Sequence, residues 1–208
     1  HQENNINFIF NSELTEIAGN DKIEKLILKN NTSILCDMLI IGIGVRPNIE
    51  FLNNLKIENG IKVDEYCQTS IEDVYAVGDV CCFKNIKKNI YSREESWNNA
   101  EQQSKIVANN ILGNKIAYDE IPWFWTDQYN ENFQFLGEID NFDNFINRQY
   151  EENKLIEFYI KKNKIVGAFA QNMGRDIKIT KEIIKNNIEF DFKLLDNLSF
   201  NLKSLIRK

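Results

Sequence analysis

The sequence predicts an α/β part followed by an α+β C-terminal domain, and three observations support this. The continuous apolar run Met38–Ile41 is typical of a strand buried on both faces of a parallel sheet. Ser96–Leu112 has the apolar spacing and the end residues of a long helix. Beyond Gly113-Asn114, alternating apolar segments are followed by one helical segment, which is the order expected of an α+β domain.

The first third of the chain divides into short elements bounded by turn residues. Gly19-Asn20-Asp21 predicts a hairpin turn, and Asn30-Asn31 predicts a second turn. We expect strands at Ile6–Phe10, Leu14–Ile17, Ile23–Leu28 and Ser33–Cys36, a short helix at Glu50–Leu55, and a brief strand at Ile61–Val63.

Two glycines, Gly42 and Gly44, directly follow the apolar run Met38–Ile41. They predict backbone pressed close either to another element or to a cofactor. Gly-x-Gly without a third glycine and a long following helix is a weak signal, so both interpretations stay open.

The segment Thr69–Asp79 is the most informative in the chain. We interpret it as a β-branched, apolar strand that ends at Gly78 and then at one carboxylate, Asp79. Ligands of open α/β sheets bind at the C-terminal ends of parallel strands, where a carboxylate accepts hydrogen bonds from ribityl or ribose hydroxyls. The alternative is a strand-ending turn with a solvated Asp.

The predicted helix Ser96–Leu112 has a Ser at its start and Gly113 after its end, which are typical capping residues. Trp97, Ala100, Ser104, Val107 and Ile111 recur at helical spacing on one face. After it, we expect antiparallel strands at Phe133–Ile139, Phe145–Tyr150, Leu155–Lys161 and Lys164–Gln171, then a helix near Asp176–Asn187 and a weaker closing segment.

Three features require a joint explanation: Asp79, the helix that opens with Ser96-Trp97, and the aromatic run Pro122–Tyr129. A helix N-terminus offers unpaired N–H groups and a partial positive charge, so it stabilises negative charge on a ligand such as a reduced flavin ring. Trp97 and Trp125 would provide apolar walls. Taken singly, Trp97 also fits core packing and the aromatic run fits a domain interface. We interpret Arg93-Glu94-Glu95 as a solvated turn.

Composition narrows the function classes. The 208 residues carry a net charge of −6, which argues against nucleic acid as a main partner. No apolar run approaches the ~20 residues that span a bilayer, so we expect no membrane partner. The four cysteines lack redox-loop spacing and a single His leaves no Cys/His metal cluster, so we expect reduced thiols and a cytoplasmic protein.

Together these motifs resemble a known family. Thr69–Asp79 resembles the second FAD-binding signature of the pyridine-nucleotide flavoprotein reductases, which is shared across that superfamily. Arg93–Ala100 and Pro122–Tyr129 are similar to the more specific motifs of ferredoxin reductases of the putidaredoxin-reductase and dioxygenase-reductase type. Thr126 stands where that family usually has Ser. The tail, from Lys164 through Asp176 and again at Asp196–Lys203, resembles the family's C-terminal domain.

The resemblance covers essentially the whole chain and implies specific roles. It implies parts of two Rossmann-like FAD/NAD domains: residues 1–40 end an NAD(P)-binding domain and 41–113 close an FAD-binding domain, while 114–208 form the reductase C-terminal α+β domain. Together with the argument about the helix N-terminus, the resemblance implies seven FAD-binding positions: Gly42, Gly44, Gly78, Asp79, Ser96, Trp97 and Trp125.

The implied activity is electron transfer from NAD(P)H through FAD to a ferredoxin or rubredoxin-type iron–sulfur acceptor. The sequence leaves open whether the protein forms a homodimer. Both glycine-rich phosphate loops of the family are absent from this sequence, so we expect a C-terminal half with weak or absent FAD binding and no activity by itself. The alternatives are a monodehydroascorbate reductase, an apoptosis-inducing-factor-like oxidase, or a non-catalytic binding or dimerisation module.

Overall fold

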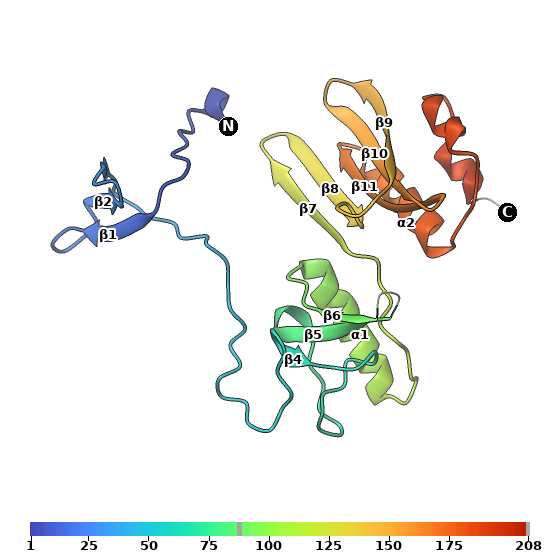
Figure 1. Ribbon diagram of the computed structural model, residues 1–208, viewed down its shortest axis with the longest axis horizontal. Coiled ribbons are helices and arrows are strands. Elements are labelled where there is room, and N and C mark those ends of the chain that lie inside the picture. The colour runs from blue at the N-terminus through green and yellow to red at the C-terminus, as the bar shows by residue number, and fades with distance from the viewer. Residues whose placement is uncertain (87–88, 207–208) are drawn as a thin grey trace. The chain divides into compact units, whose positions relative to one another are not determined.

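The computed structural model describes residues 1–86 and 89–206, and the chain divides into two units (Figure 1). The first unit comprises His1–Arg46 and the second Pro47–Lys208. Within the described residues, no helix is both long enough and apolar enough to cross a membrane.

The first unit contains a small antiparallel sheet with the strand order β1-β2-β3. Its strands are β1 (Leu14–Ala18), β2 (Lys25–Leu28) and β3 (Ser33–Leu35), and a 3₁₀ turn, η1 (Gln2–Asn4), precedes them. The expected hairpin and third strand are therefore confirmed. The strand expected at Ile6–Phe10 is wrong, because this segment pairs with no strand among the described residues and its side chains are exposed.

The strand expected at Met38–Ile41 is also wrong. Met38 is 77% exposed and Ile40 is 85% exposed, and the segment is irregular. A strand buried on both faces requires neighbouring strands and covering layers, and the described residues pair none with it. The backbone at Gly42 and Gly44 is open within the first unit, with nothing within 4 Å of an added Cβ, so no element of this unit packs against either glycine among the described residues.

The second unit begins with a small mixed sheet in the order β4-β5-β6. Here β4 (Ile61–Lys62) runs parallel to β5 (Cys81–Asn85), and β6 (Ile90–Ser92) runs antiparallel to β5. The expected strand near Ile61 is confirmed. The helix expected at Glu50–Leu55 is wrong. The segment has only a turn, closed by the Leu52 N–H donating to the Ile49 carbonyl at 3.1 Å, and Asn54 is left-handed at φ +70°, which does not fit a helix.

The segment Thr69–Asp79 is not the expected strand. The Thr69 N–H donates to the Val74 carbonyl at 2.8 Å, which closes a turn, and Asp73 is left-handed at φ +61°. Gln68 and Tyr75 form an isolated bridge, and the segment ends in the 3₁₀ helix η2 (Gly78–Val80). Asp79 therefore lies just before the start of the parallel strand β5, and not at the C-terminal end of a strand.

Helix α1 (Trp97–Ile111) begins and ends where the sequence predicts. Ser96 caps its start, and Gly113 follows its end in the left-handed region at φ +87°. Its buried face differs from the apolar stripe in the sequence. Trp97 and Ile111 are about two-thirds exposed, at 66% and 65%. The side chains that α1 buries are amides: Asn98, Asn99 and Gln103.

The rest of the second unit is an antiparallel sheet in the order β7-β8-β11-β10-β9 (Figure 1). Its strands are β7 (Trp123–Gln128), β8 (Glu131–Gly137), β9 (Asn144–Glu151), β10 (Lys154–Lys161) and β11 (Lys164–Gln171); then follow α2 (Gly174–Lys185), η3 (Phe192–Asp196) and η4 (Leu202–Leu205). Four strands and the helix are thus confirmed. The structure adds β7, which the sequence shows as an aromatic run.

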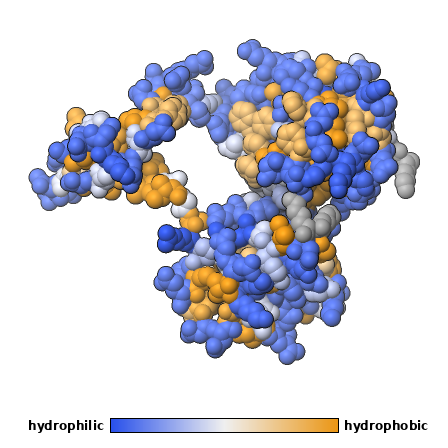
Figure 2. Space-filling model, in the orientation of Figure 1, coloured by the Kyte–Doolittle hydropathy of each residue, from blue (hydrophilic) through white to orange (hydrophobic). Residues whose placement is uncertain are grey.

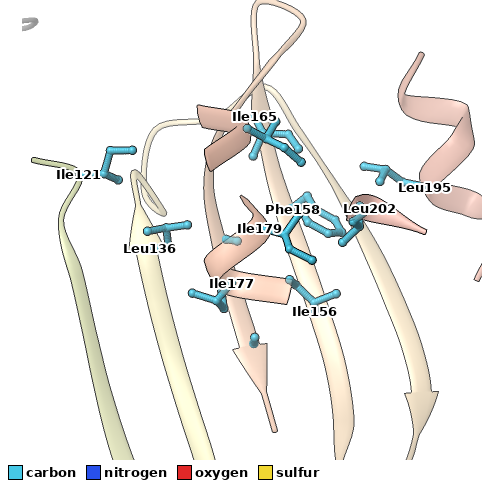
Figure 3. Packing of buried hydrophobic residues seen from close by; sticks show 12 residues of the cluster. Ile121, Leu136, Ile156, Phe158, Ile165, Ile177, Ile179, Leu195 and Leu202 are labelled. Atoms are coloured by element: carbon cyan, nitrogen blue, oxygen red, sulfur yellow. The ribbon is translucent and has the colours of Figure 1, made fainter. Parts of the chain in front are cut away.

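One face of this sheet carries the main hydrophobic core, which α2 and the two closing 3₁₀ helices cover (Figure 3). Phe158 of β10 and Ile177 of α2 are fully buried there, together with Leu195 of η3. Arg148 of β9 fastens the closing segment to the sheet. Its Nη2 donates to the backbone carbonyls of Asn197, Leu198 and Phe200 at 2.9–3.0 Å.

The opposite face of the sheet carries a row of aromatic rings. Phe124 stacks on Phe135 with 4.7 Å between ring centroids, and Phe135 lies 5.0 Å from Phe169. Hydrophobic side chains gather on the visible surface of this sheet domain (Figure 2). Trp123 and Trp125 alternate with Phe124 along β7, so they point to the other side.

Candidate functional site

The N-terminus of α1 is fixed by hydrogen bonds from the residues around it. The Ser96 Oγ accepts the Asn99 N–H at 3.1 Å and donates its own proton to Glu94 Oε1 at 2.9 Å. The Asn99 side chain donates to the Glu94 carbonyl at 2.9 Å and accepts from the Tyr118 hydroxyl at 2.7 Å. The N–H groups of Trp97 and Asn98, in the first turn, have no acceptor within the helix.

This helix start borders a pocket of about 390 Å³. The pocket lies between the first turn of α1 and strand β7, both within the second unit. Its lining residues are Glu94, Glu95, Ser96, Trp97, Asn98, Trp123, Phe124 and Trp125. The structure thus brings together three of the site residues expected from the sequence, namely Ser96, Trp97 and Trp125.

Three tryptophans give the pocket its apolar wall. Trp97 meets Trp125 edge to face with 5.9 Å between centroids, and Trp125 stacks on Trp123 at 4.8 Å. The Trp123 Nε1 donates to Gln134 Oε1 at 3.2 Å, which fixes the orientation of its ring. A planar ring that entered here would meet both an indole surface and the positive end of a helix.

Gly78 packs against the same helix one turn further along. Its N–H donates to the Gln103 Oε1 at 2.7 Å, and an added Cβ would lie 3.3 Å from the Ala100 Cβ. Its φ of +74° also favours glycine. No larger residue fits this close approach of η2 to α1 without strain.

Asp79 is exposed and does not line the pocket, but Arg93 connects its backbone to the pocket rim. The Arg93 Nη1 donates to the Asp79 carbonyl at 3.0 Å and forms an ion pair with Glu95, which lines the pocket. The Arg93 side chain is only 12% exposed, so the interpretation of Arg93-Glu94-Glu95 as a solvated turn is wrong. Gly42 and Gly44 belong to the first unit and are described apart from this pocket.

Burial controls the charge state of two groups near the helix start. Desolvation raises the pKa of the Glu94 carboxyl above its ordinary value, and the hydrogen bond from Ser96 opposes this only in part. Desolvation likewise raises the pKa of Tyr118, so that its hydroxyl stays a proton donor. The polar network beneath the pocket is therefore held in one pattern of donors and acceptors.

Sequence reasoning did not name five of the lining residues as site residues, namely Glu94, Glu95, Asn98, Trp123 and Phe124. The signal for Trp123 was present, since residues two apart in a strand share a face and Trp125 was already expected at the site. No comparable signal exists for Glu94, because the pocket that it lines is completed by β7, which lies far along the chain.

Comparison with known proteins gives two family matches. The model for the pyridine nucleotide-disulphide oxidoreductases matches residues 1–104, which is half of the chain. The model for a reductase C-terminal domain matches residues 123–206.

Solved structures match over almost the whole chain. A ferredoxin reductase from Rhodopseudomonas palustris matches with a TM-score of 0.82 and 30% identity, covering 93% of this chain and 49% of that one. Putidaredoxin reductase, solved in a covalent complex with putidaredoxin, matches with a TM-score of 0.81 and 28% identity, covering 94% and 48%.

A NAD-dependent persulfide reductase from A. fulgidus shares the fold, with a TM-score of 0.76 and 18% identity, covering 97% of this chain and 42% of that one. The chain therefore spans about half the length of the solved relatives that it matches.

Proposed function

Because this chain belongs to the pyridine nucleotide-disulphide oxidoreductase family and has the fold of its ferredoxin reductases, we propose that it is part of an FAD-dependent NAD(P)H:ferredoxin or rubredoxin oxidoreductase. The observation that carries this proposal is the pocket where the capped start of α1 meets Trp97 and Trp125. The activity of the whole protein is part of the proposal, since the chain spans about half of its solved relatives.

The residues of the pocket fit a flavin ring. A volume of about 390 Å³ lies within the ~300–1,000 Å³ of small-molecule sites, and the indole rings of Trp97, Trp123 and Trp125 form its apolar wall. The first-turn N–H groups of α1 supply donors and a partial positive charge without any titrating side chain. These are the features that favour a planar, electron-rich ring.

In this proposal each expected residue has a defined task. Asp79 holds the ribityl and diphosphate region of FAD, and Gly78 lets that segment approach α1. The N-terminus of the Ser96-capped helix stabilises negative charge on the ring, while Trp97 and Trp125 border it and exclude water. Gly42 and Gly44 contact the cofactor where the chain passes between the two nucleotide-binding domains. FAD, when bound, would supply hydride acceptance from NAD(P)H and release of single electrons.

The proposal includes the domain division given by the sequence: 1–40 as the end of the NAD(P)-binding domain, 41–113 as part of the FAD-binding domain, and 114–208 as the C-terminal domain. An iron–sulfur protein as acceptor is supported by the relative that is solved in complex with putidaredoxin.

The test is to compare electron acceptors with the complete gene product. We expect NAD(P)H-dependent reduction of a ferredoxin or rubredoxin to be faster than reduction of ascorbate radical or oxygen. Faster turnover with ascorbate radical would favour a monodehydroascorbate reductase, and faster turnover with oxygen an apoptosis-inducing-factor-like oxidase. A product that binds no flavin and oxidises no NAD(P)H would leave a binding or dimerisation module.

A further inference from the structure

Glu94 lines the pocket beside the start of α1, and two hydrogen bonds hold it there, one to its carboxyl and one to its backbone carbonyl. The Ser96 hydroxyl donates its one proton to Glu94 Oε1, while its oxygen accepts the Asn99 N–H. The Asn99 amide holds the Glu94 backbone carbonyl. The carboxyl is therefore positioned beside the pocket, and it does not sample the solvent as a free surface side chain would.

The charged groups around Glu94 are committed elsewhere. Arg93 is paired with Glu95 and with the Asp79 carbonyl, and the buried Tyr118 hydroxyl points to Asn99. Strand β7 presents only Trp123, Phe124 and Trp125 to the pocket. Among the described residues no cation is paired with Glu94. The ionised carboxylate is therefore stabilised only by the Ser96 hydroxyl and by the water that reaches it.

We propose that Glu94 is a specificity-determining residue of this pocket, which takes up one proton as an aromatic ring enters and then offers that ring an O–H donor. The inference rests on the proposed flavin site. A ring that fills the pocket removes water from the carboxylate, and an uncompensated charge in that environment is neutralised by binding a proton from solvent. The neutral acid also avoids repulsion with a ring that carries negative charge.

The raised pKa of Glu94 in the empty pocket agrees with this proposal, because burial already disfavours the charged form there. A ring in the pocket adds desolvation in the same direction. Binding is then linked to protonation, and for one linked proton the affinity falls by at most ~10-fold for each unit by which the pH rises between the two pKa values.

The first experiment follows the carboxyl directly. Chains labelled with ¹³C at the glutamate carboxyl are titrated by NMR, and the Glu94 signal is assigned by its loss in Glu94→Gln. We expect this signal to titrate above the ordinary range for Glu. The control is Glu101→Gln, which removes a half-buried carboxyl of α1 that is paired with Lys105 one turn further along the helix. A Glu94 signal that titrates at or below the ordinary value overturns the proposal.

The second experiment uses the complete gene product freed of its own flavin, because the chain by itself is expected to bind flavin weakly or not at all. The ligand is riboflavin, which carries the tricyclic ring without a phosphate that titrates near neutral pH. Binding is followed by quenching of tryptophan fluorescence at about pH 5 and about pH 8. We expect the affinity of the wild-type chain to fall with rising pH, and that of Glu94→Gln, which cannot ionise, to stay constant. Glu101→Gln should follow the wild type.

The outcomes distinguish a failure of the proposed role of Glu94 from a failure of the proposed ring site. Riboflavin binding without pH dependence in the wild-type chain overturns the role of Glu94 and leaves the ring site intact. Absence of riboflavin binding by the wild type and both variants overturns the ring site and this inference together.

Discussion

The two long helices of the second unit bury different kinds of side chain. Helix α1 turns the amides Asn98, Asn99 and Gln103 inward, whereas α2 turns Ile177, Ile179, Thr180 and Ile183 inward. On α1, the Asn99 and Gln103 side chains have hydrogen-bond partners, while the isoleucines of α2 fill the main core. Hydrogen bonds fix orientation and hydrophobic burial supplies free energy. The start of α1, which borders the pocket, is thus positioned by polar contacts. Further along α1, Ile106 and Val107 pack against a smaller core, and α2 is held by packing in the main core.

The largest expected effect tests the packed helix. Ile183→Ala removes a fully buried side chain from α2 and should lower the free energy of unfolding by ~2–5 kcal/mol, because the cavity left behind adds to the lost burial. The matched control is Ile111→Ala on α1, where the same side chain is exposed. Urea unfolding measures both. Similar losses at the two positions would contradict the assignment of the core.

The next effect tests the polar helix. Asn99→Ala leaves the buried Tyr118 hydroxyl without its acceptor and the Glu94 carbonyl without its donor, and should cost ~1–3 kcal/mol. Adding Tyr118→Phe to that variant removes the stranded hydroxyl, so the double variant should cost less than the sum of the single variants. Strict additivity in urea unfolding would show that the two side chains do not interact.

A smaller effect concerns the start of α1. Ser96→Ala removes the cap that accepts the Asn99 N–H and should cost ~1 kcal/mol. Ser104→Ala on the same helix is the control, since its hydroxyl is exposed and bonds only the Glu101 carbonyl. The first variant also removes the hydrogen bond that lowers the pKa of Glu94, so that pKa should rise further. Equal unfolding midpoints for the two variants would contradict a capping role for Ser96.

The sequence allowed prediction of what depends on near neighbours. The ends of α1 follow from Ser96 and Gly113, and the hairpin from β10 to β11 follows from Lys162 and Asn163, both of which are left-handed in the structure. Such capping and turn preferences act over a few residues, so a single sequence reveals them. The family resemblance, which also rests on local motifs, is confirmed by the comparisons.

What could not be predicted depends on distant partners. Met38–Ile41 has the composition of a buried strand but pairs with no strand in the described residues. Thr69–Asp79 contains β-branched residues, yet the Ser-Ile-Glu-Asp sequence within it favours a turn that competes with strand formation. The sequence did not predict that α1 buries amide side chains. Asn99 and Gln103 bond to Tyr118 and to Gly78 of η2, and the apolar spacing within a helix gives no information about such partners.

The smallest expected effect compares two carboxyls, one from each part of the second unit. Burial raises the pKa of Glu94, whereas hydrogen bonds, first from Gln171, lower the pKa of Glu131 at the start of β8. A raised native pKa stabilises the fold at low pH, and this contribution is lost as the pH rises from ~4.3 through the native value. A lowered native pKa contributes above ~4.3, and its contribution is lost as the pH falls through the native value.

Glu94→Gln and Glu131→Gln should therefore change the pH dependence of unfolding in opposite directions. Relative to the wild type, Glu94→Gln should gain stability as the pH rises from ~4.3 to the raised native pKa of Glu94, and Glu131→Gln should lose stability as the pH rises from the lowered native pKa of Glu131 to ~4.3. The Glu131 effect should be the smaller, because that carboxyl is solvated and its hydrogen bonds to Gln171 and Asn172 compete with water. Urea midpoints measured across this range decide the matter. Parallel pH profiles for the two variants would mean that the Glu94 carboxyl is as well hydrated as the Glu131 carboxyl. Burial would then not favour the protonated form of Glu94, and the proposed proton uptake in the pocket would lose its basis.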